Sequence, residues 1–381
     1  MTRETIISVA IQALVLLCVG AGISYFSLNA IDNMTALGLT GGFGFLDQAA
    51  GFDITFSVIA YERGVSSYGR VLLVGITNTL VVSALAVILA TIIGVTVGVF
   101  QLLGNWPLAR ICRAYIELAR NVPLLLQLLF WYTGVLATLP QQRNSLSALD
   151  MVYLNVRGLF IPWPDRTAGS NAFILAMLLG IAVWIFAAVR AKRVRVQTGR
   201  SVPGHLIGFG AVLGLGAMSV AVMGTPFDWT YPVLTGFNFR GGAALPPEFV
   251  ALLIGLSVYT GAFIAEQVRG GIQAVPSGQR EAAVALGLSN WRVMKLVMIP
   301  QAMRIIVPPL TSQYLNVVKN SSLAVAIAYP DIVSVFTGTA LNQTGRAIEI
   351  VAITMAFYFV VSLTISAVMN IYNKRVALVG R

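Results

Sequence analysis

Repeated long apolar runs constrain this chain more than any other feature of its sequence. Eight segments consist largely of apolar side chains: 6–28, 71–100, 122–140, 171–190, 205–224, 247–270, 305–328 and 347–372. A run of about 20 apolar residues is long enough to cross the hydrocarbon core of a bilayer as an α-helix. Membrane β-barrels instead show short segments of alternating polarity, whereas these runs are continuous. The sequence therefore predicts an all-α polytopic membrane protein with about eight transmembrane helices.

The distribution of basic residues predicts the orientation of these spans. Charged residues make up only 10% of the 381 residues, and the net charge is +11. With the N-terminus in the cytoplasm, 17 of the 25 Lys and Arg residues lie on the cytoplasmic side and 7 on the other, with Lys319 inside a span. This bias follows the positive-inside rule. We expect both termini in the cytoplasm, a retained first span, contacts with membrane lipids and no nucleic-acid partner.

Several kinds of chemistry lack the residues that they need. No Gly-Lys pair occurs, so the chain has no P-loop for ATP. The single histidine, His205, stands at the start of a span, where we expect an interfacial residue. With only two cysteines and one histidine, a zinc or haem site is not expected. The sequence predicts neither an enzyme nor a cofactor in this chain.

Small residues at helical spacing predict where spans pack closely. Gly94 and Gly98 form one pair four residues apart, and Gly210 and Gly214 form another. Such pairs allow helix backbones to approach each other in lipid. The loops 29–69, 141–170 and 225–246 carry Pro, Gly and aromatic residues, and we expect turns in them.

The stretch SGQREAAVALGLSNWRVMKLVMIPQ, residues 277–301, differs from the apolar runs around it. Its pattern predicts two short helices, the first capped by Ser277 and the second by Ser289. Gly287 fits the left-handed position that stops the first helix, with Leu288 folding back toward Ala283. Pro300 is expected to kink the chain as it returns to the membrane.

Two interpretations of this stretch remain open from composition alone. Small side chains surrounded by charges suit a helix that docks in a groove of another protein. An amphipathic helix lying on lipid is the alternative, but it usually carries larger apolar residues and Trp. Only the second half of the stretch, around Trp291 and Leu296, has that character.

The same residues resemble a known motif. Glu281, Ala282, Ala283, Gly287 and Pro300 follow the pattern of the EAA loop in bacterial ABC importer permeases. In that family the loop forms a coupling helix that sits in a cleft of the ATPase subunit. The resemblance implies that residues 277–287, here called the coupling segment and including Leu286, contact an ATPase.

Further motifs resemble the polar amino-acid branch of that family. They are RNVPLLLQLLFWY (120–132), YTGAFIAEQVRGGIQAVPSGQREAAVALGLS (259–289) and VVKNSSLA (317–324). The longer general L-amino-acid and glutamate/glutamine/aspartate/asparagine permeases are similar over additional segments. The resemblance implies a division into an extra N-terminal span and loop (1–69), a first core part (70–140), an insertion with two extra spans (141–246) and a second core part (247–381). The two core parts hold the five core spans.

The resemblance also implies the partners and the cellular location. It implies a second, similar permease subunit, a dimer of cytoplasmic ATPases that binds ATP and Mg²⁺, and a periplasmic amino-acid-binding protein. The chain is then expected in the bacterial inner membrane, where it moves L-amino acids inward by alternating access.

Polar residues inside the spans are the candidates for contact with an amino acid. Lys319, Asn320, Ser321 and Ser322 lie within a span, where an ionisable residue is a functional candidate by default. Glu266 and Tyr259 are further candidates. In the structural alternative, Lys319 pairs with Glu266 or a backbone carbonyl and fixes the bundle. Asn78 and Thr79 are expected to form helix–helix hydrogen bonds.

Two other functions compete with the importer. A secondary transporter driven by an ion gradient needs acidic residues at mid-membrane, and only Glu266 comes close. A scaffold subunit without transport activity would leave Lys319 unexplained. Hydrolysis of ATP that depends on substrate separates these possibilities.

Overall fold

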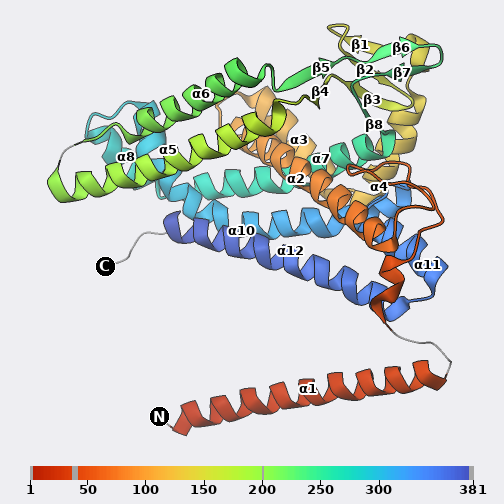
Figure 1. Ribbon diagram of the computed structural model, residues 1–381. Helices are drawn as coiled ribbons and strands as arrows, with labels where there is room; N and C mark the ends of the chain where they lie inside the picture. The colour runs from red at the N-terminus through yellow and green to blue at the C-terminus, as the bar shows by residue number, and fades with distance from the viewer. Residues whose placement is uncertain (1–2, 37–41, 200, 377–381) are drawn as a thin grey trace. The chain divides into compact units, whose positions relative to one another are not determined.

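The computed structural model describes residues 3–36, 42–199 and 201–376, which are mostly helical (Figure 1). Six of the described helices are long and apolar enough to cross a membrane. They are α2 (Tyr68–Phe100), α5 (Ser170–Thr198), α6 (Gly204–Met223), α7 (Pro247–Gln273), the continuous helix Asn290–Ile327 and α12 (Ala347–Lys374 of Ala347–Val376). The structure thus confirms an all-α polytopic membrane protein.

Among the described residues, six helices have the length and hydropathy of a membrane span, or seven if one bent pair counts as a single span, against the eight predicted. The predicted span 122–140 consists of short pieces: α4 (Leu124–Leu129), a π-helical turn η2 (Phe130–Val135) and a 3-10 turn η3 (Leu136–Thr138). It passes as a span only together with α3 (Trp106–Asn121), as one broken helix. The predicted span 6–28 lies within α1 (Arg3–Ala36), whose described apolar stretch is Ile11–Phe26.

The chain divides into two compact units, of which the first joins two segments that are far apart in the sequence. Unit 1 comprises Met1–Asn121 and Leu256–Arg381, and unit 2 comprises Val122–Gly255. The division into four parts at residues 69, 140 and 246 came from the family resemblance. It stays a prediction, because the two units are defined by packing within this chain.

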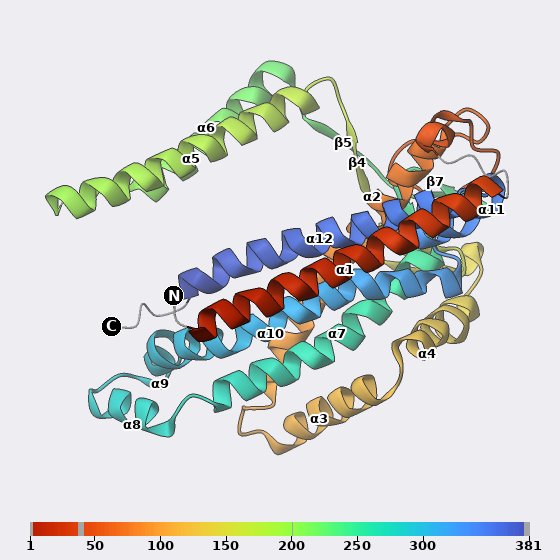
Figure 2. The ribbon, with the colours of Figure 1, turned by 90° about the horizontal axis from the view of Figure 1, so that it is seen from below.

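Glycines bring the backbones of unit 1 together. A Cβ atom on Gly94 would lie 2.5 Å from the Cβ of Ile264, and one on Gly98 would lie 2.7 Å from the carbonyl oxygen of Ala265. The predicted close approach at Gly94 and Gly98 is therefore confirmed, and it joins α2 to α7. Helix α10 (Ile299–Asn320) runs beside α12 (Figure 1) and beside α7 (Figure 2) in the same unit.

Residues 42–67 cover one end of unit 1. The 3-10 helix η1 (Phe43–Asp47) packs Phe45 against Tyr68 of α2 and Phe336 of the π-helix η7 (Val333–Ala340). Ile350 of α12 belongs to the same apolar core. The short helix α11 (Leu341–Thr344) connects η7 to α12.

Unit 2 holds a helical hairpin and short strands. In the hairpin, α5 and α6 meet at Gly180 and Gly208, where added Cβ atoms would collide with Val212 and Trp184. The other predicted pair is corrected: nothing in the described residues lies within 4 Å of a Cβ added at Gly210 or Gly214. His205 accepts a hydrogen bond from the Trp184 indole nitrogen, 3.2 Å away.

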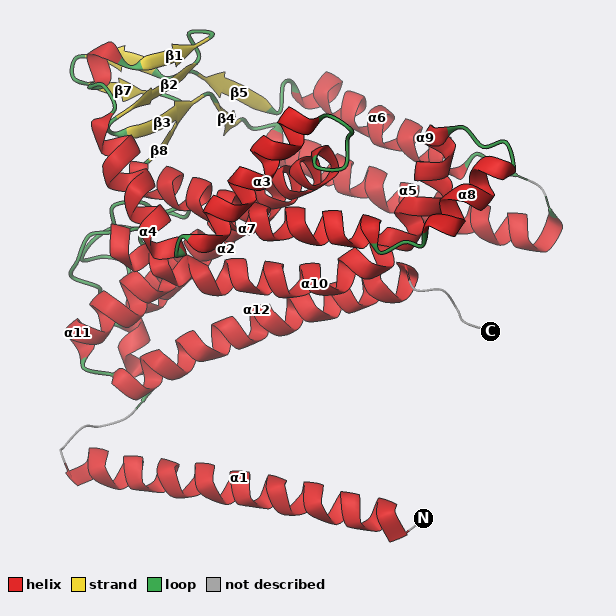
Figure 3. Ribbon diagram, turned by 180° about the vertical axis from the view of Figure 1, so that it is seen from behind, coloured by secondary structure: helices red, strands yellow, loops and turns green. Residues whose placement is uncertain are grey.

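The predicted loops 141–170 and 225–246 contain strands, and this is a correction to their assignment as turns (Figure 3). One antiparallel sheet has the order β1 (Leu146–Ala148), β2 (Val152–Asn155), β3 (Gly158–Ile161) and β8 (Ala243–Leu245). Two further antiparallel pairs join β4 (Trp163–Arg166) to β5 (Phe227–Thr230), and β6 (Val233–Thr235) to β7 (Asn238–Arg240). A short 3-10 turn η4 (Gln142–Asn144) precedes β1. Since β3 and β8 pair across about 80 residues of sequence, local patterns do not reveal them.

We predict that Gly94→Ala destabilises the chain. Its Cβ has no room against Ile264, and overpacking of this kind costs about 1–3 kcal/mol. The thermal unfolding temperature in detergent should fall for Gly94→Ala and stay level or rise for the control Gly210→Ala, where the space is open. Equal unfolding temperatures for the two variants would contradict the close α2–α7 contact.

Candidate coupling and substrate-contact sites

The coupling segment forms a short helix that ends in a glycine turn. Helix α8 (Ser277–Ala285) is followed by Gly287 with φ of +77°. The amide of Leu288 donates to the Ala283 carbonyl over 3.2 Å, and the amide of Gly287 donates to the Val284 carbonyl over 2.9 Å. These two bonds are those of a Schellman motif, so the predicted stop at Gly287 is confirmed.

One face of α8 is anchored and the rest is exposed. Ala283 is buried in an apolar cluster with Val293 and Met298, whereas Glu281, Ala282 and Gly287 are exposed. Leu286 is 82% exposed although its side chain is apolar. Val284 is also 48% exposed, so the end of α8 and the turn after it leave adjacent apolar side chains uncovered, which suits contact with another protein.

Three local details of the stretch differ from the prediction. Residue Pro276, not Ser277, stands at the N-cap of α8, and no side chain caps the helix. Ser289 is at the N-cap of α9 (Asn290–Val293), again without a side-chain hydrogen bond. The second helix does not end before the membrane: α9, a π-turn η5 (Met294–Met298) and α10 run on as one helix.

Pro300 explains the π-turn. It lies at the second position of α10, and its ring nitrogen cannot donate to a carbonyl one turn earlier. The π-helical turn, with its wider hydrogen bonding, lies directly before this proline. The expected kink is thus replaced by a π-turn within a continuous helix.

Residues Lys319 to Ser322 lie where α10 changes into the 3-10 helix η6 (Ser321–Ile327). Lys319 is exposed, Asn320 and Ser322 are half-buried, and Ser321 is fully buried. Both serine hydroxyls donate to backbone carbonyls three residues earlier, over 2.7 Å each. Of these residues, only Lys319 therefore offers an uncommitted charged group among the described residues.

Glu266 pairs with Arg269 one turn later on α7, so the alternative ion pair between Lys319 and Glu266 is not formed. Tyr259 lies two turns before Glu266 on α7, and Phe263 lies between them in the sequence. The centres of the Tyr259 and Phe263 rings are 5.0 Å apart. Arg120 of α3 lies over that Phe263 ring, 5.1 Å from its centre.

A polar cavity of about 510 Å³ lies beside this face of α7. The residues that line it come from the end of α2, from α3 and from α7: Gln101, Ala109, Arg113, Ile116, Glu117, Arg120, Glu266, Arg269 and Gln273. It contains both acidic and basic groups, which match the two charges of an amino acid. Sequence reasoning identified Glu266 but missed its partners on α3, because only the fold brings that helix to α7.

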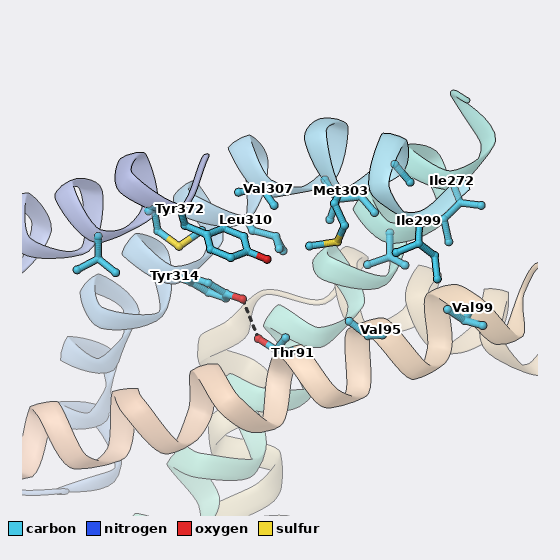
Figure 4. A pocket seen from close by; sticks show the side chains of 15 residues that line it. Thr91, Val95, Val99, Ile272, Ile299, Met303, Val307, Leu310, Tyr314 and Tyr372 are labelled. Carbon is cyan, nitrogen blue, oxygen red and sulfur yellow. Dashed lines mark hydrogen bonds between the residues drawn. The ribbon is translucent and has the colours of Figure 1, made fainter. Parts of the chain in front are cut away.

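A second cavity, of about 480 Å³, is apolar (Figure 4). Its lining side chains come from α2, α7, α10 and α12, and its labelled polar contact is the 3.0 Å hydrogen bond between Thr91 and Tyr314. Binding a zwitterion there would leave both charges without partners in an apolar environment. This cavity therefore suits an amino acid less well than the polar one does.

Asn78 and Thr79 bond to loop backbone instead of to another helix, which corrects their prediction. The fully buried Asn78 amide donates to the carbonyls of Phe56 and Pro330, over 3.0 and 2.8 Å, and accepts from the Val58 amide over 3.2 Å. Thr79 accepts from the Ile332 amide over 3.1 Å. Together they tie segment 42–67 and the residues before η7 to α2.

Comparisons with known proteins agree with this architecture. Residues 196–378 match the family described as "Binding-protein-dependent transport system inner membrane component". A protein of Escherichia coli (strain K12) named as an amino-acid ABC transporter permease is 49% identical, over 97% of this chain and 94% of that protein. A general L-amino acid transport system permease of Rhizobium johnstonii is 44% identical, over 98% and 93%.

A third relative has a narrower printed substrate range. It is a glutamate/glutamine/aspartate/asparagine transport system permease of Rhodobacter capsulatus, 40% identical over 98% of this chain and 94% of that protein. All three alignments cover nearly the full length of both proteins, including the N-terminal and inserted segments. The chain belongs to the permease family of amino-acid ABC transporters.

Proposed function

We propose that this chain is the membrane-spanning subunit of an importer that moves L-amino acids into the cytoplasm, driven by ATP hydrolysis on a separate subunit. The single observation that supports this most is the exposed coupling segment. It is held rigidly by the Gly287 turn, anchored by Ala283, and presents Leu286 to solvent. The membership in the amino-acid ABC permease family supports the same function and disfavours an ion-coupled transporter.

The coupling segment suits transmission of force between subunits. Helix α8 follows α7 after only three residues, and α9 leads without a break into α10. A movement imposed on α8 would therefore act on two long helices of unit 1. We infer that an ATPase partner, with its bound ATP and Mg²⁺, contacts α8 and moves these helices.

The remaining partners follow from the same proposal. Inward transport by alternating access requires a second permease subunit to complete the pathway and a binding protein on the periplasmic side. The excess of basic residues on one side supports an inner-membrane location with both termini in the cytoplasm. The coupling segment would then face the cytoplasmic ATPase.

Two regions are proposed to contact the amino acid during transport. Lys319 offers a charge for its carboxylate, with Asn320, Ser321 and Ser322 next to it. The polar cavity at Glu266 offers groups of both signs, with Tyr259 two turns away along α7. Both regions belong to unit 1.

We predict that Leu286→Asp uncouples the importer without unfolding the chain. Since the Leu286 side chain is 82% exposed, a carboxylate there should leave the fold intact. Removing that carboxylate from water in an interface with the ATPase costs free energy and should weaken the contact. Substrate-stimulated ATP hydrolysis by the reconstituted complex should fall at least about tenfold, equal to about 1.4 kcal/mol. The control Leu149→Asp replaces a 91% exposed leucine in unit 2 and should keep wild-type hydrolysis. Full stimulation in Leu286→Asp would contradict the proposed contact.

We further predict that Lys319→Met weakens substrate use. Loss of a hydrogen bond to a charged group costs about 1.5–3 kcal/mol. The amino-acid concentration for half-maximal uptake into vesicles should rise about tenfold or more, while the thermal unfolding temperature changes little because Lys319 is exposed. Lys192→Met, which removes an exposed lysine of α5, is the matched control. A lower unfolding temperature with unchanged uptake affinity would show a structural role for Lys319.

A further inference from the structure

A buried carboxyl group lies in the connection between η6 and η7, outside the membrane-spanning helices. Asp331 has no exposed surface, and neither has the neighbouring Tyr329. Aspartate is rarely buried to this extent unless it is paired. Sequence analysis did not single it out, because it is one acidic residue in the apolar run around YPDIVSVF.

Within the part of the chain that the structure describes, only one of the two carboxyl oxygens of Asp331 has a hydrogen-bond partner. Its Oδ1 atom accepts from the Ser334 amide over 2.8 Å, which holds the first turn of η7. Its Oδ2 atom is buried and makes no hydrogen bond in the described part of the chain. An unpaired buried oxygen of an ionised carboxylate is costly, whereas a protonated one carries an O–H group that can donate.

A second unpaired group lies on the neighbouring helix. The hydroxyl of Tyr358, on α12, is also buried and has no hydrogen bond of normal geometry among the described residues. It lies close enough to Asp331 and to Ser321 to interact with both. Ser321 belongs to the KNSS motif of the sequence, so this motif reaches the same site from η6.

No positive charge balances Asp331 in the described residues. The titratable groups that interact with it are Tyr329, on the same connection, and Tyr358, on α12. Phenols of this kind are uncharged at neutral pH. From α2 the neighbouring groups are Asn78, bonded to the Pro330 carbonyl, and Thr79, bonded to the Ile332 amide, and both are uncharged.

We propose that Asp331 is a proton-binding site that is occupied when η7 is packed against α2 and α12. A proton taken from water forms the O–H bond on Oδ2, and the neutral carboxyl group then has a hydrogen-bond donor in the same buried region as the Tyr358 hydroxyl. Release of this proton to water leaves a buried anion without a counter-charge, and the packing of η7 weakens. The site thus makes the stability of this end of unit 1 depend on pH.

The direction of the pH effect follows from the environment of the carboxyl. Burial raises the pKa of Asp331 to about 7 from its usual value of 3.8, against the opposing effect of backbone amides. Between these two values the folded chain binds more protons at this group than the unfolded chain does. Stability from this group is therefore complete below about pH 4 and is lost as the pH rises toward 7.

An infrared titration of the purified full-length chain tests the protonation directly, without any assay of transport. The carbonyl band of a protonated carboxylic acid should be present at pH 6 and lost by pH 8, and Asp331→Asn should remove it. Glu62→Gln, at an exposed carboxyl of segment 42–67, should keep it. A spectrum at pH 6 that is the same in wild type and Asp331→Asn would overturn the proposal.

Thermal unfolding supplies a second readout. The unfolding temperature of the wild type should fall between pH 5 and pH 7.5 by more than that of Asp331→Asn, whose side chain has the same shape without the titration. Parallel temperature profiles would overturn the proposal. If Asp331→Asn does not fold, Asp331→Ser takes its place, and a carbonyl band at pH 6 that Asp331→Ser retains would likewise overturn the proposal. Failure of ATP-driven transport would leave both readouts unaffected.

Discussion

The close contact between α2 and α7 at Gly94 and Gly98 fixes the part of unit 1 from which the coupling segment extends. Lipid gives no hydrophobic driving force between helices, so association depends on tight packing of backbones. Helix α8 begins only four residues after the end of α7. Since α7 is held against α2, and Ala283 of α8 packs in one apolar cluster with Ile264 and Val268 of α7, a displacement of α8 would act on these helices.

The sequence predicts those features that depend on neighbouring residues. Apolar runs predict most of the long helices, and the Gly287 turn is predicted because only glycine readily adopts its left-handed conformation. Features that depend on distant pairing are missed. The strand pair β3–β8, the arginines of α3 beside Glu266, and the bonds of Asn78 to Phe56 and Pro330 all join segments far apart in the chain. The paired glycines show the same limit. The spacing is identical at 94 and 98 and at 210 and 214, but among the described residues only the first pair meets another helix.

Unit 1 contains two sites of different character. The coupling segment is exposed and suited to receive a partner, whereas Asp331 is buried and suited to respond to protons. Asn78 links the second site to segment 42–67, so that α2 contacts both the α7 helix near one end and the η7 region near the other. Movement of α7 and α10 during transport would change the packing around η6 and η7, because η6 continues α10 directly.

A measurement of which energy source drives transport tests the central claim most directly. The chain is reconstituted in vesicles with its ATPase, second permease and binding protein, and accumulation of radiolabelled L-amino acids is measured with ATP on the ATPase side. We predict accumulation that requires ATP and persists when ionophores collapse all ion gradients. Accumulation driven by a proton or sodium gradient in the absence of ATP would contradict the assignment of this chain as an ATP-driven importer subunit.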